Sequence, residues 1–542
     1  MHRNRGNVIR YSVFVLGIFI FAAGCDDGPP PAPEACSIEY NLPADIAGPL
    51  SAATNSDFHR DSWQTFLALA APEVGASVAS RGDNPTQWSK WSSSVEMIKC
   101  NLDNQNCDCV EGDCRNPGSR YYPPECRSVP GYESMRVLSA IDKFDDSVLQ
   151  AKKKGLSDDP LIDANGKFVR YEILLSPPAY TYLAENGYYS WPELYSLDPP
   201  QNLNFPCGVE SYRGGDPAQD ESGAFVLKIA WMEDGLPGQN YHKEDLLVYT
   251  PANRTRDGES ATCERQNLAM VGMHVAHKTV KQPNWTWATW EHRRNAPDCA
   301  GLPPAGEQKR VWNTNCPESV EADYNFARAD CSGGICQSCN VSPESNAPPG
   351  GCYDSYIEDQ RGWCPNQPPA AERGYSYLCR QVPIEANYPS AALWNDRCTA
   401  ALGDESVWSQ YELVATQWLT YDEEPTVCEN VQASFIAKCG EKNPDCAGPK
   451  LDSRARTFPQ VDIPATNDPE DLNVQRRPWL GNTSMESYER SNCSGCHGIG
   501  LATANQDPIR VSTDFMYFVQ FETCAAWCAE VGDETCECML PN

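Results

Sequence analysis

The chain has 542 residues with 74 acidic and 43 basic side chains, so its formal net charge is −31. So acidic a surface argues against binding to nucleic acids and to anionic lipids, and it favours cationic partners. The simplest reason for the charge is solubility. Hydrophobic residues make up 41% of the chain and include 15 tryptophans, which is enough to build a packed core.

Residues 1–24 have the features of a lipoprotein signal peptide. Three arginines precede an apolar run over residues 13–23, which is too short to span a membrane comfortably. The run ends in small residues before Cys25, and this resembles the bacterial lipoprotein cleavage box, in which the cysteine is lipidated. An ordinary signal peptide or an uncleaved anchor is the alternative. The proline-rich residues 25–45 are then a flexible tether, and we expect a lipid-anchored protein that faces the periplasm or the cell surface.

The 27 cysteines agree with an oxidising compartment. If Cys25 is lipidated and the two cysteines of a C-terminal motif described below have another role, an even number of cysteines remains. An even number is expected of an exported protein with disulfide bonds, although the sequence does not reveal their pairing. Two cysteine-rich stretches, about residues 99–131 and 298–380, are predicted to be disulfide-bonded insertions. Three cysteines of the second stretch, ending at Cys339, have plant-ferredoxin spacing. Disulfides explain them better, because iron–sulfur clusters are assembled in the cytoplasm.

Hydrophobic patterning predicts a strand-rich α+β main domain over residues 46–440. A short helix is expected over residues 62–71, where apolar side chains recur on one face. Strands are expected over residues 168–175, 225–231, 246–250, 268–280, 285–292 and 411–419, and a second helix over 431–438. The strand over 268–280 alternates most clearly, with His274 and Lys278 on its polar face.

The C-terminal part divides into an extended segment and a small helical module. Regularly spaced prolines forbid long helices over residues 441–475, which are predicted to lie extended on the main domain. The module covers residues 476–542. Thr483 and Glu486 have capping-box form for its first helix, and Asp514 is a candidate cap for its second helix.

The module contains the run Cys493-Ser494-Gly495-Cys496-His497, and Cys-x-x-Cys-His is the attachment signature of a c-type haem. The thiols of Cys493 and Cys496 add to the two vinyl groups of one porphyrin, and His497 places an imidazole under the iron as proximal ligand. Zinc or a thioredoxin-like dithiol is the alternative for Cys-x-x-Cys, but no second ligand pair follows at zinc spacing. We therefore predict one covalent haem c and a cytochrome c-type module.

The sequence leaves the distal iron ligand open. Met516, on the expected second helix, is the first candidate, and Met485 and Met539 are further methionines of the module. His274 and His292 of the main domain are the histidine alternatives. A methionine would raise the redox potential, a histidine would lower it, and an empty position would permit ligand chemistry.

Several short patches stand out along the chain. They are residues 63–69, 228–231, 272–278, 287–295, 411–418, 482–497 and 514–515. Together they resemble a family of large exported bacterial proteins described as cytochrome c family proteins, which have a single C-terminal haem motif. The resemblance implies the same covalent haem but no defined physiological role. The chain departs from the pattern at Trp290, where we expect phenylalanine, and in its cysteine-bearing insertions.

Four side chains of the main domain are candidate catalytic groups. His274, Lys278, Glu291 and His292 are expected on neighbouring strands, where they would line a cleft facing the haem. The alternative is a buried polar network between the two strands. The tryptophans of the stretch 285–290 are interpreted as core residues rather than as an electron relay.

Three functions are compatible with these features. The leading one is a membrane-tethered extracytoplasmic monohaem cytochrome that exchanges single electrons with a redox partner protein, whose surface would be cationic. The first alternative is a haem-dependent oxidoreductase acting on a substrate, oxygen or peroxide held between the main domain and the haem. The second alternative is a binding or scaffold protein with a sensor or structural haem.

Overall fold

The protein is described here from a computed structural model. The structure describes residues 35–36, 42–71, 85–138, 151–152, 158–159, 161–196, 203–208, 222–250, 252, 260–300, 316–317, 319–320, 322–329, 339–340, 376–419, 428, 480–487, 493, 497, 501–504, 507–512, 514, 516, 518–519 and 523–524. The predicted signal peptide, Cys25, the predicted helix over 431–438 and the segment 441–475 lie outside these residues. The described residues from Cys36 onward belong to one compact unit.

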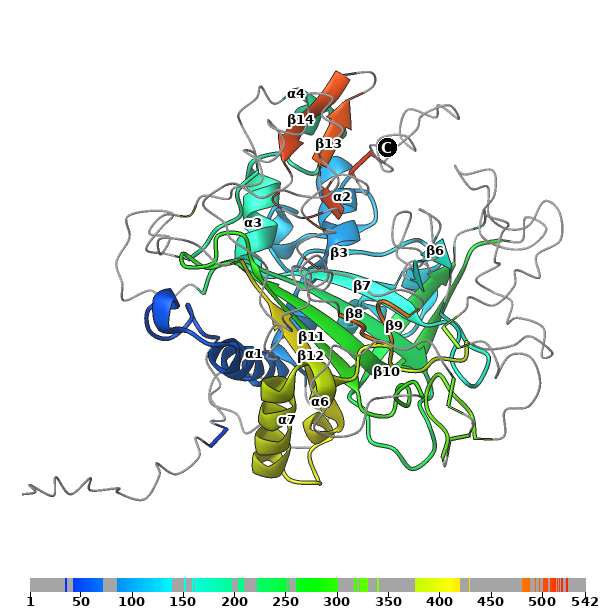
Figure 1. The fold of residues 1–542 in the computed structure, drawn as a ribbon. Helices are drawn as coiled ribbons and strands as arrows, with labels where there is room; N and C mark the ends of the chain where they lie inside the picture. The colour runs from blue at the N-terminus through cyan, green and yellow to red at the C-terminus, as the bar shows by residue number, and fades with distance from the viewer. Residues whose placement is uncertain are drawn as a thin grey trace, which may run out of the picture. The chain divides into compact units, whose positions relative to one another are not determined.

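An eight-stranded sheet forms the centre of the fold (Figure 1). Its main path runs β1-β7-β8-β10-β11-β12, and β9 and β4 extend it from β10. The strands are β1 Ser92–Ser93, β4 Val137–Leu138, β7 Arg170–Leu175, β8 Phe225–Glu233, β9 Lys243–Thr250, β10 Thr262–His277, β11 Thr286–His292 and β12 Tyr411–Gln417. Neighbouring strands are antiparallel except β4 and β9. The predicted strand-rich α+β architecture is confirmed.

The long strand β10 organises the sheet. One of its edges pairs with β8, whereas the other edge pairs first with β9 and then with β11. The register with β8 shifts between Met270 and Gly272, so β10 has a bulge there. β10 begins earlier than predicted, since residues 262–266 pair with β9. The prediction missed these residues because they are largely exposed and polar and lack the apolar alternation that marks a buried strand.

Helices cover one face of the sheet beside β11 and β12. The described helices are α1 Asn55–Ala70, α2 Ser94–Leu102, α3 Pro177–Glu185, α4 Trp191–Ser196, α6 Ile384–Asn387 and α7 Pro389–Leu402. Helices α1 and α7 contact each other and both contact β12 (Figure 1). The ring of Phe66 on α1 stacks on that of Trp290 on β11 with centroids 4.9 Å apart, so α1 closes this face of the sheet.

Helix α1 contains the helix predicted over residues 62–71 as its second half. It begins earlier, at Asn55, because Thr54 and Asp57 form a capping box. The apolar face predicted for this helix is buried, as expected. The helix ends at Ala70, close to the predicted end.

Seven disulfide bonds join cysteines within the described part of the chain. They are Cys36–Cys398, Cys100–Cys107, Cys109–Cys114, Cys126–Cys263, Cys207–Cys428, Cys299–Cys379 and Cys316–Cys339. The bond of Cys126 ties the first predicted insertion to β10, which contains Cys263. Because Cys339 pairs with Cys316, it is not an iron–sulfur ligand.

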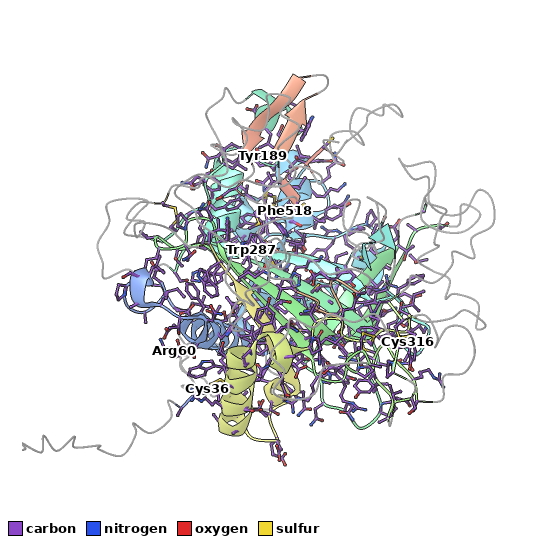
Figure 2. All side chains as sticks on the ribbon, viewed as in Figure 1. Cys36, Arg60, Tyr189, Trp287, Cys316 and Phe518 are labelled. Atoms are coloured by element: carbon purple, nitrogen blue, oxygen red, sulfur yellow. A yellow bond between two sulfur atoms is a disulfide. The ribbon has the colours of Figure 1, made fainter. Side chains whose placement is uncertain are left out.

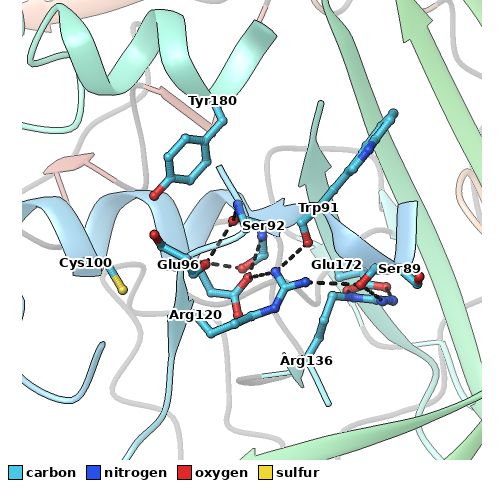
Figure 3. A network of polar contacts seen from close by, with 12 residues as sticks. Ser89, Trp91, Ser92, Glu96, Cys100, Arg120, Arg136, Glu172 and Tyr180 are labelled. Carbon is cyan, nitrogen blue, oxygen red and sulfur yellow. Dashed lines mark hydrogen bonds and ion pairs between the residues drawn. The ribbon is translucent and has the colours of Figure 1, made fainter. Parts of the chain in front are cut away.

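A buried ionic network fastens the short strand β4 to the sheet (Figure 3). Arg136, next to β4, pairs with Glu172 on β7 and with Glu244 on β9, each at 2.8 Å. Nearby, Arg120 pairs with Glu96 of α2 at 3.1 Å. Burial raises the pKa of Glu96, and the guanidinium of Arg120 opposes this shift. Such pairs hold their elements in place, because loss of one partner leaves a buried charge uncompensated.

Residues 480–487 pack on the face of the sheet opposite α1. The side-chain amide of Asn482 donates hydrogen bonds to Thr289 Oγ1 at 2.7 Å and to the Trp290 carbonyl oxygen at 2.8 Å. Ser484 lies over Gly272, where a Cβ atom would be only 2.0 Å from Ser484 Oγ. A glycine at the bulge of β10 therefore allows this segment to lie directly on the sheet.

Residues 483–487 form a turn and not the start of the predicted first helix. Asn482 takes the capping position expected of Thr483, because its carbonyl oxygen accepts hydrogen bonds from the backbone N–H groups of Met485 and Glu486. The Thr483 hydroxyl donates to a carboxylate of the sheet instead. Capping-type bonds thus form at Asn482, one residue earlier than predicted and in a turn instead of a helix, since a tertiary partner competes for the Thr483 hydroxyl.

A hairpin that was not predicted follows the Cys-x-x-Cys-His motif. β13 Leu501–Ala504 pairs antiparallel with β14 Asp507–Ser512, and both strands contact α4 (Figure 1). Phe518 and Val519 are helical, in agreement with the predicted second helix, and both are buried in the core of the main sheet. The described C-terminal residues thus contribute to the main core.

Replacing Gly272 by alanine should lower the free energy of unfolding by about 1–3 kcal/mol, because the added methyl group overlaps Ser484 and forces this segment off the sheet. Chemical denaturation measures the change. Gly481→Ala is the matched control, since a Cβ there meets nothing closer than 3.4 Å. Adding Ser484→Gly to Gly272→Ala should recover much of the loss. A Gly272→Ala protein as stable as the parent would contradict this packing.

Candidate functional site

The predicted attachment residue Cys493 lies beside the end of β12. Its side chain is 8% exposed and belongs to the apolar core of the sheet. Its backbone N–H donates a 2.8 Å hydrogen bond to the side-chain oxygen of Gln417, the last residue of β12. Cys493 and His497 are both helical. Cys496 lies outside the described residues.

The imidazole of His497 lies next to the indole of Trp287 on β11. The ring centroids are 4.5 Å apart and the ring planes are inclined by 37°. Along β11, Trp287 shares a strand face with Thr289 and Glu291, which both bind the segment around residue 482. One face of β11 therefore binds both the segment before the motif and the motif histidine.

Apolar side chains of the C-terminal part belong to the cluster that contains Trp287. Figure 2 labels Trp287 and one of these side chains, Phe518. Met516 is 2% exposed and Phe518 is 6% exposed, and both belong to the same apolar cluster as Cys493 and Trp287. Met516, the predicted distal ligand, is thus buried in the cluster that contains the first attachment cysteine. Met485 is buried in a separate cluster.

The candidate Lys278 forms a buried ion pair with Asp514. Its ammonium group lies 2.5 Å from the carboxylate and donates to Asn204 Oδ1 at 2.8 Å. The same carboxylate accepts the backbone N–H of Phe205 at 2.7 Å, and the Asp514 carbonyl oxygen accepts the indole N–H of Trp285 at 3.0 Å. Burial lowers the pKa of Lys278 and raises the pKa of Asp514, and the mutual attraction opposes both shifts. Asp514 therefore links the C-terminal part to the sheet and is not the predicted helix cap.

Glu291 is a second link between the sheet and the C-terminal part. One carboxylate oxygen accepts the backbone N–H and the hydroxyl of Thr483, at 2.7 and 2.6 Å. The other oxygen accepts the guanidinium of Arg380, which also pairs with Glu412 and Asp298. Burial lowers the pKa of Arg380, but the three carboxylates outweigh it and raise that pKa well above its ordinary value. Glu291 is thus a fully engaged structural group.

His292 lies on the other face of β11 from Trp287. Its Nε2 lies 3.0 Å from the Asn240 carbonyl oxygen, and its Nδ1 accepts the backbone N–H of Arg294 at 3.1 Å. These partners require a neutral imidazole protonated on Nε2. The ring stacks on Tyr241 with centroids 4.2 Å apart. Burial lowers the pKa of His292 to about 3, so it is a neutral core residue at ordinary pH.

His274 is the one of the four candidates whose side chain is partly exposed. It is opposite Thr289 in the β10–β11 register, on the face that binds the C-terminal segment. Its Nε2 lies 3.4 Å from Glu486 Oε1, and the two side chains are 19% and 15% exposed. The pair is a weak contact across the junction between the sheet and the turn over residues 483–487.

The geometry assigns roles to several residues that were not predicted from the sequence. Gln417 holds the backbone at Cys493, Trp287 contacts His497, and Asn482 binds β11. A usable signal existed. Each of these residues falls within one of the short patches singled out in the sequence, and the structure brings those patches into mutual contact.

A further group of cysteines meets the distance requirement for a metal site. The Sγ atoms of Cys100, Cys107 and Cys114 lie within 4.8 Å of one another. All three cysteines are disulfide-bonded, so this group belongs to the disulfide-bonded insertion over about residues 99–131. Within the described residues, no helix is both long and apolar enough to cross a membrane.

Comparison with known proteins adds no assignment to this geometry. No protein-family model, curated protein or solved structure matches the chain. The contacts of the described residues are therefore the basis for the function proposed below.

Replacing Lys278 by methionine should lower the free energy of unfolding by about 3–5 kcal/mol, because the carboxylate of Asp514 stays buried without its cation. The double variant Lys278→Met/Asp514→Leu should recover much of this loss, as measured by denaturant unfolding. Arg265→Ala breaks the exposed pair with Asp245 and is the control, with almost no effect expected. Equal stabilities for the parent and Lys278→Met would refute the structural role of the pair.

His292 should make the protein less stable in mild acid. Its pKa is about 3 in the fold and 6.5 in the unfolded chain. Its contribution is complete above the unfolded value and is lost as the pH falls from 6.5 towards 3, because only the unfolded chain takes up the proton. The stability advantage of the parent over His292→Gln should shrink by about 2 kcal/mol between about pH 7 and about pH 5. Denaturant titrations at both pH values test this, and a constant difference would count against a buried neutral imidazole.

Proposed function

We propose that this chain is an extracytoplasmic monohaem c-type cytochrome that transfers single electrons. Cys493 and Cys496 would hold the porphyrin through thioether bonds, and His497 would be the proximal ligand of the iron. The position of the motif supports this most strongly, because Cys493 is buried in the core of the main sheet and His497 lies against Trp287.

The residues at this position suit a covalent haem. A thiol, an imidazole and the thioether of Met516 occur together with apolar walls such as Trp287 and Phe518, and burial of this kind sets the polarity around an iron porphyrin. The bound haem would supply the one-electron chemistry. The chain would bury and orient the group, and the hydrogen bond from the Cys493 backbone to Gln417 fixes the start of the motif.

Electron transfer is favoured over chemistry on a bound substrate. A general acid or base must reach a proton of its substrate, whereas Lys278, Glu291 and His292 are fully buried and engaged by protein partners. Only His274, of the four candidates, combines partial exposure with a place on the face that binds the motif segment. A haem-dependent oxidoreductase would therefore have to rely on His274 or on a group outside the predicted set.

Export and a lipid anchor at Cys25 complete the proposal. Disulfide bonds persist in oxidising compartments, and the bonds found among the described cysteines include Cys36–Cys398 and Cys126–Cys263, which join distant parts of the chain. The net charge of −31 favours a cationic redox partner through electrostatic steering. The protein would thus exchange electrons at a bacterial membrane, on its extracytoplasmic side.

The absorption spectra of the purified protein in both oxidation states test the proposal. Expression with a cytochrome c maturation system should give a coloured protein with the reduced-state bands of a thioether-linked haem. Met516→Ala should abolish the sulfur-to-iron band of the oxidised protein, whereas Met485→Ala, which removes a methionine from a separate cluster, should leave it unchanged.

Two results would count against the proposal. A colourless protein from cells that mature a control cytochrome would remove the haem altogether. Ready binding of carbon monoxide by the reduced protein would show an open iron position and would favour the oxidoreductase over the electron carrier.

A further inference from the structure

The indole N–H of Trp287 is a buried donor beside the predicted iron ligand. Its side chain is 6% exposed, and none of the described residues accepts a hydrogen bond from its Nε1 atom. A buried polar group without a partner costs about 1–3 kcal/mol, so such donors in native proteins call for an explanation.

The surroundings of Trp287 narrow the choice of acceptor. Its ring lies 4.5 Å from that of His497, and it packs in the apolar cluster that also contains Cys493 and Met516. The motif and C-terminal residues of that cluster are apolar or carry sulfur, which is a weak acceptor, and the neighbouring imidazole of His497 makes no hydrogen bond with the indole N–H. The acceptor that fits this position best is therefore one that arrives with the cofactor.

A haem bears two propionate carboxylates, and a carboxylate near an apolar core needs donors to be stable there. We propose that the Trp287 indole donates a hydrogen bond to a propionate of the haem c, an inference that rests on the function proposed above. The donor sits on β11, the same strand whose Glu291 binds the segment before the motif. The sheet would thus orient the haem as well as the polypeptide.

The bond has a consequence for the redox potential. The negative charge of a propionate stabilises the oxidised iron. A hydrogen bond from the indole N–H partly neutralises this charge and therefore weakens the stabilisation. Loss of the donor should therefore favour the oxidised state. At a fixed ambient potential, the ratio of reduced to oxidised protein should fall about threefold to tenfold, where tenfold corresponds to about 59 mV for a one-electron couple.

The test compares Trp287→Phe with Trp290→Phe in the haem-loaded protein. Both substitutions keep a ring and remove an indole N–H from β11 that has no described acceptor, but Trp290 faces α1, where it stacks on Phe66. Trp287→Phe should lower the midpoint potential and shift the propionate bending band in the resonance Raman spectrum. Trp290→Phe should leave both unchanged. In the parent protein the same band should shift in deuterated water, a measurement that needs no variant.

The outcomes separate this inference from the proposed function. A haem-loaded Trp287→Phe protein with parental potential and parental Raman band overturns the inference and leaves the cytochrome intact. Equal shifts in both variants also overturn it, because they would reflect general repacking. Failure of the parent to acquire haem overturns the proposed function, and this inference with it.

Discussion

A carboxylate in the middle of the sheet, Glu291, constrains the whole arrangement. The register of β11 and β12 places it directly opposite Glu412, and two like charges facing each other inside a protein are unfavourable. The guanidinium of Arg380 pairs with both and reduces their repulsion. The remaining oxygen of Glu291 accepts two hydrogen bonds from Thr483. One buried charge cluster therefore joins two strands, a distant loop and the segment before the Cys-x-x-Cys-His motif.

The position of the motif follows from anchors on either side of it. Thr483 is bound before the motif and Asp514 after it, and Gln417 binds the backbone at Cys493 itself. Such bonds require defined partners, because each would leave a costly buried group if the segment moved. The apolar contacts of Met516 and Phe518 add stability, but the hydrophobic effect is non-directional and does not fix one position of the segment. Polar anchors therefore specify where the motif lies, and apolar burial holds it there.

The local hydrophobic pattern was enough to predict much of the sheet, but it did not predict the contacts between the sheet and the Cys-x-x-Cys-His motif. Hydrophobic patterning predicted β7, β8, β11 and β12, because each is buried along almost its whole length and therefore has a nearly continuous apolar sequence. It missed the exposed first half of β10 and the hairpin of β13 and β14. The roles of Lys278 and Asp514 depend on a contact between residues far apart in the chain, and neither residue carries a local signal for it. Glu291 and His292 are buried polar residues, as in the alternative to a catalytic cleft, but their partners lie outside the two strands between which that network was predicted.

Covalent attachment of haem to the motif is the central claim, and mass spectrometry of the mature protein tests it most directly. The account predicts that the proteolytic peptide containing Cys493 and Cys496 carries the added mass of one haem, and that a Cys493→Ser/Cys496→Ser protein lacks it. Recovery of that peptide with the two cysteines as free thiols or as a disulfide, from cells that attach haem to a control cytochrome, would contradict the account.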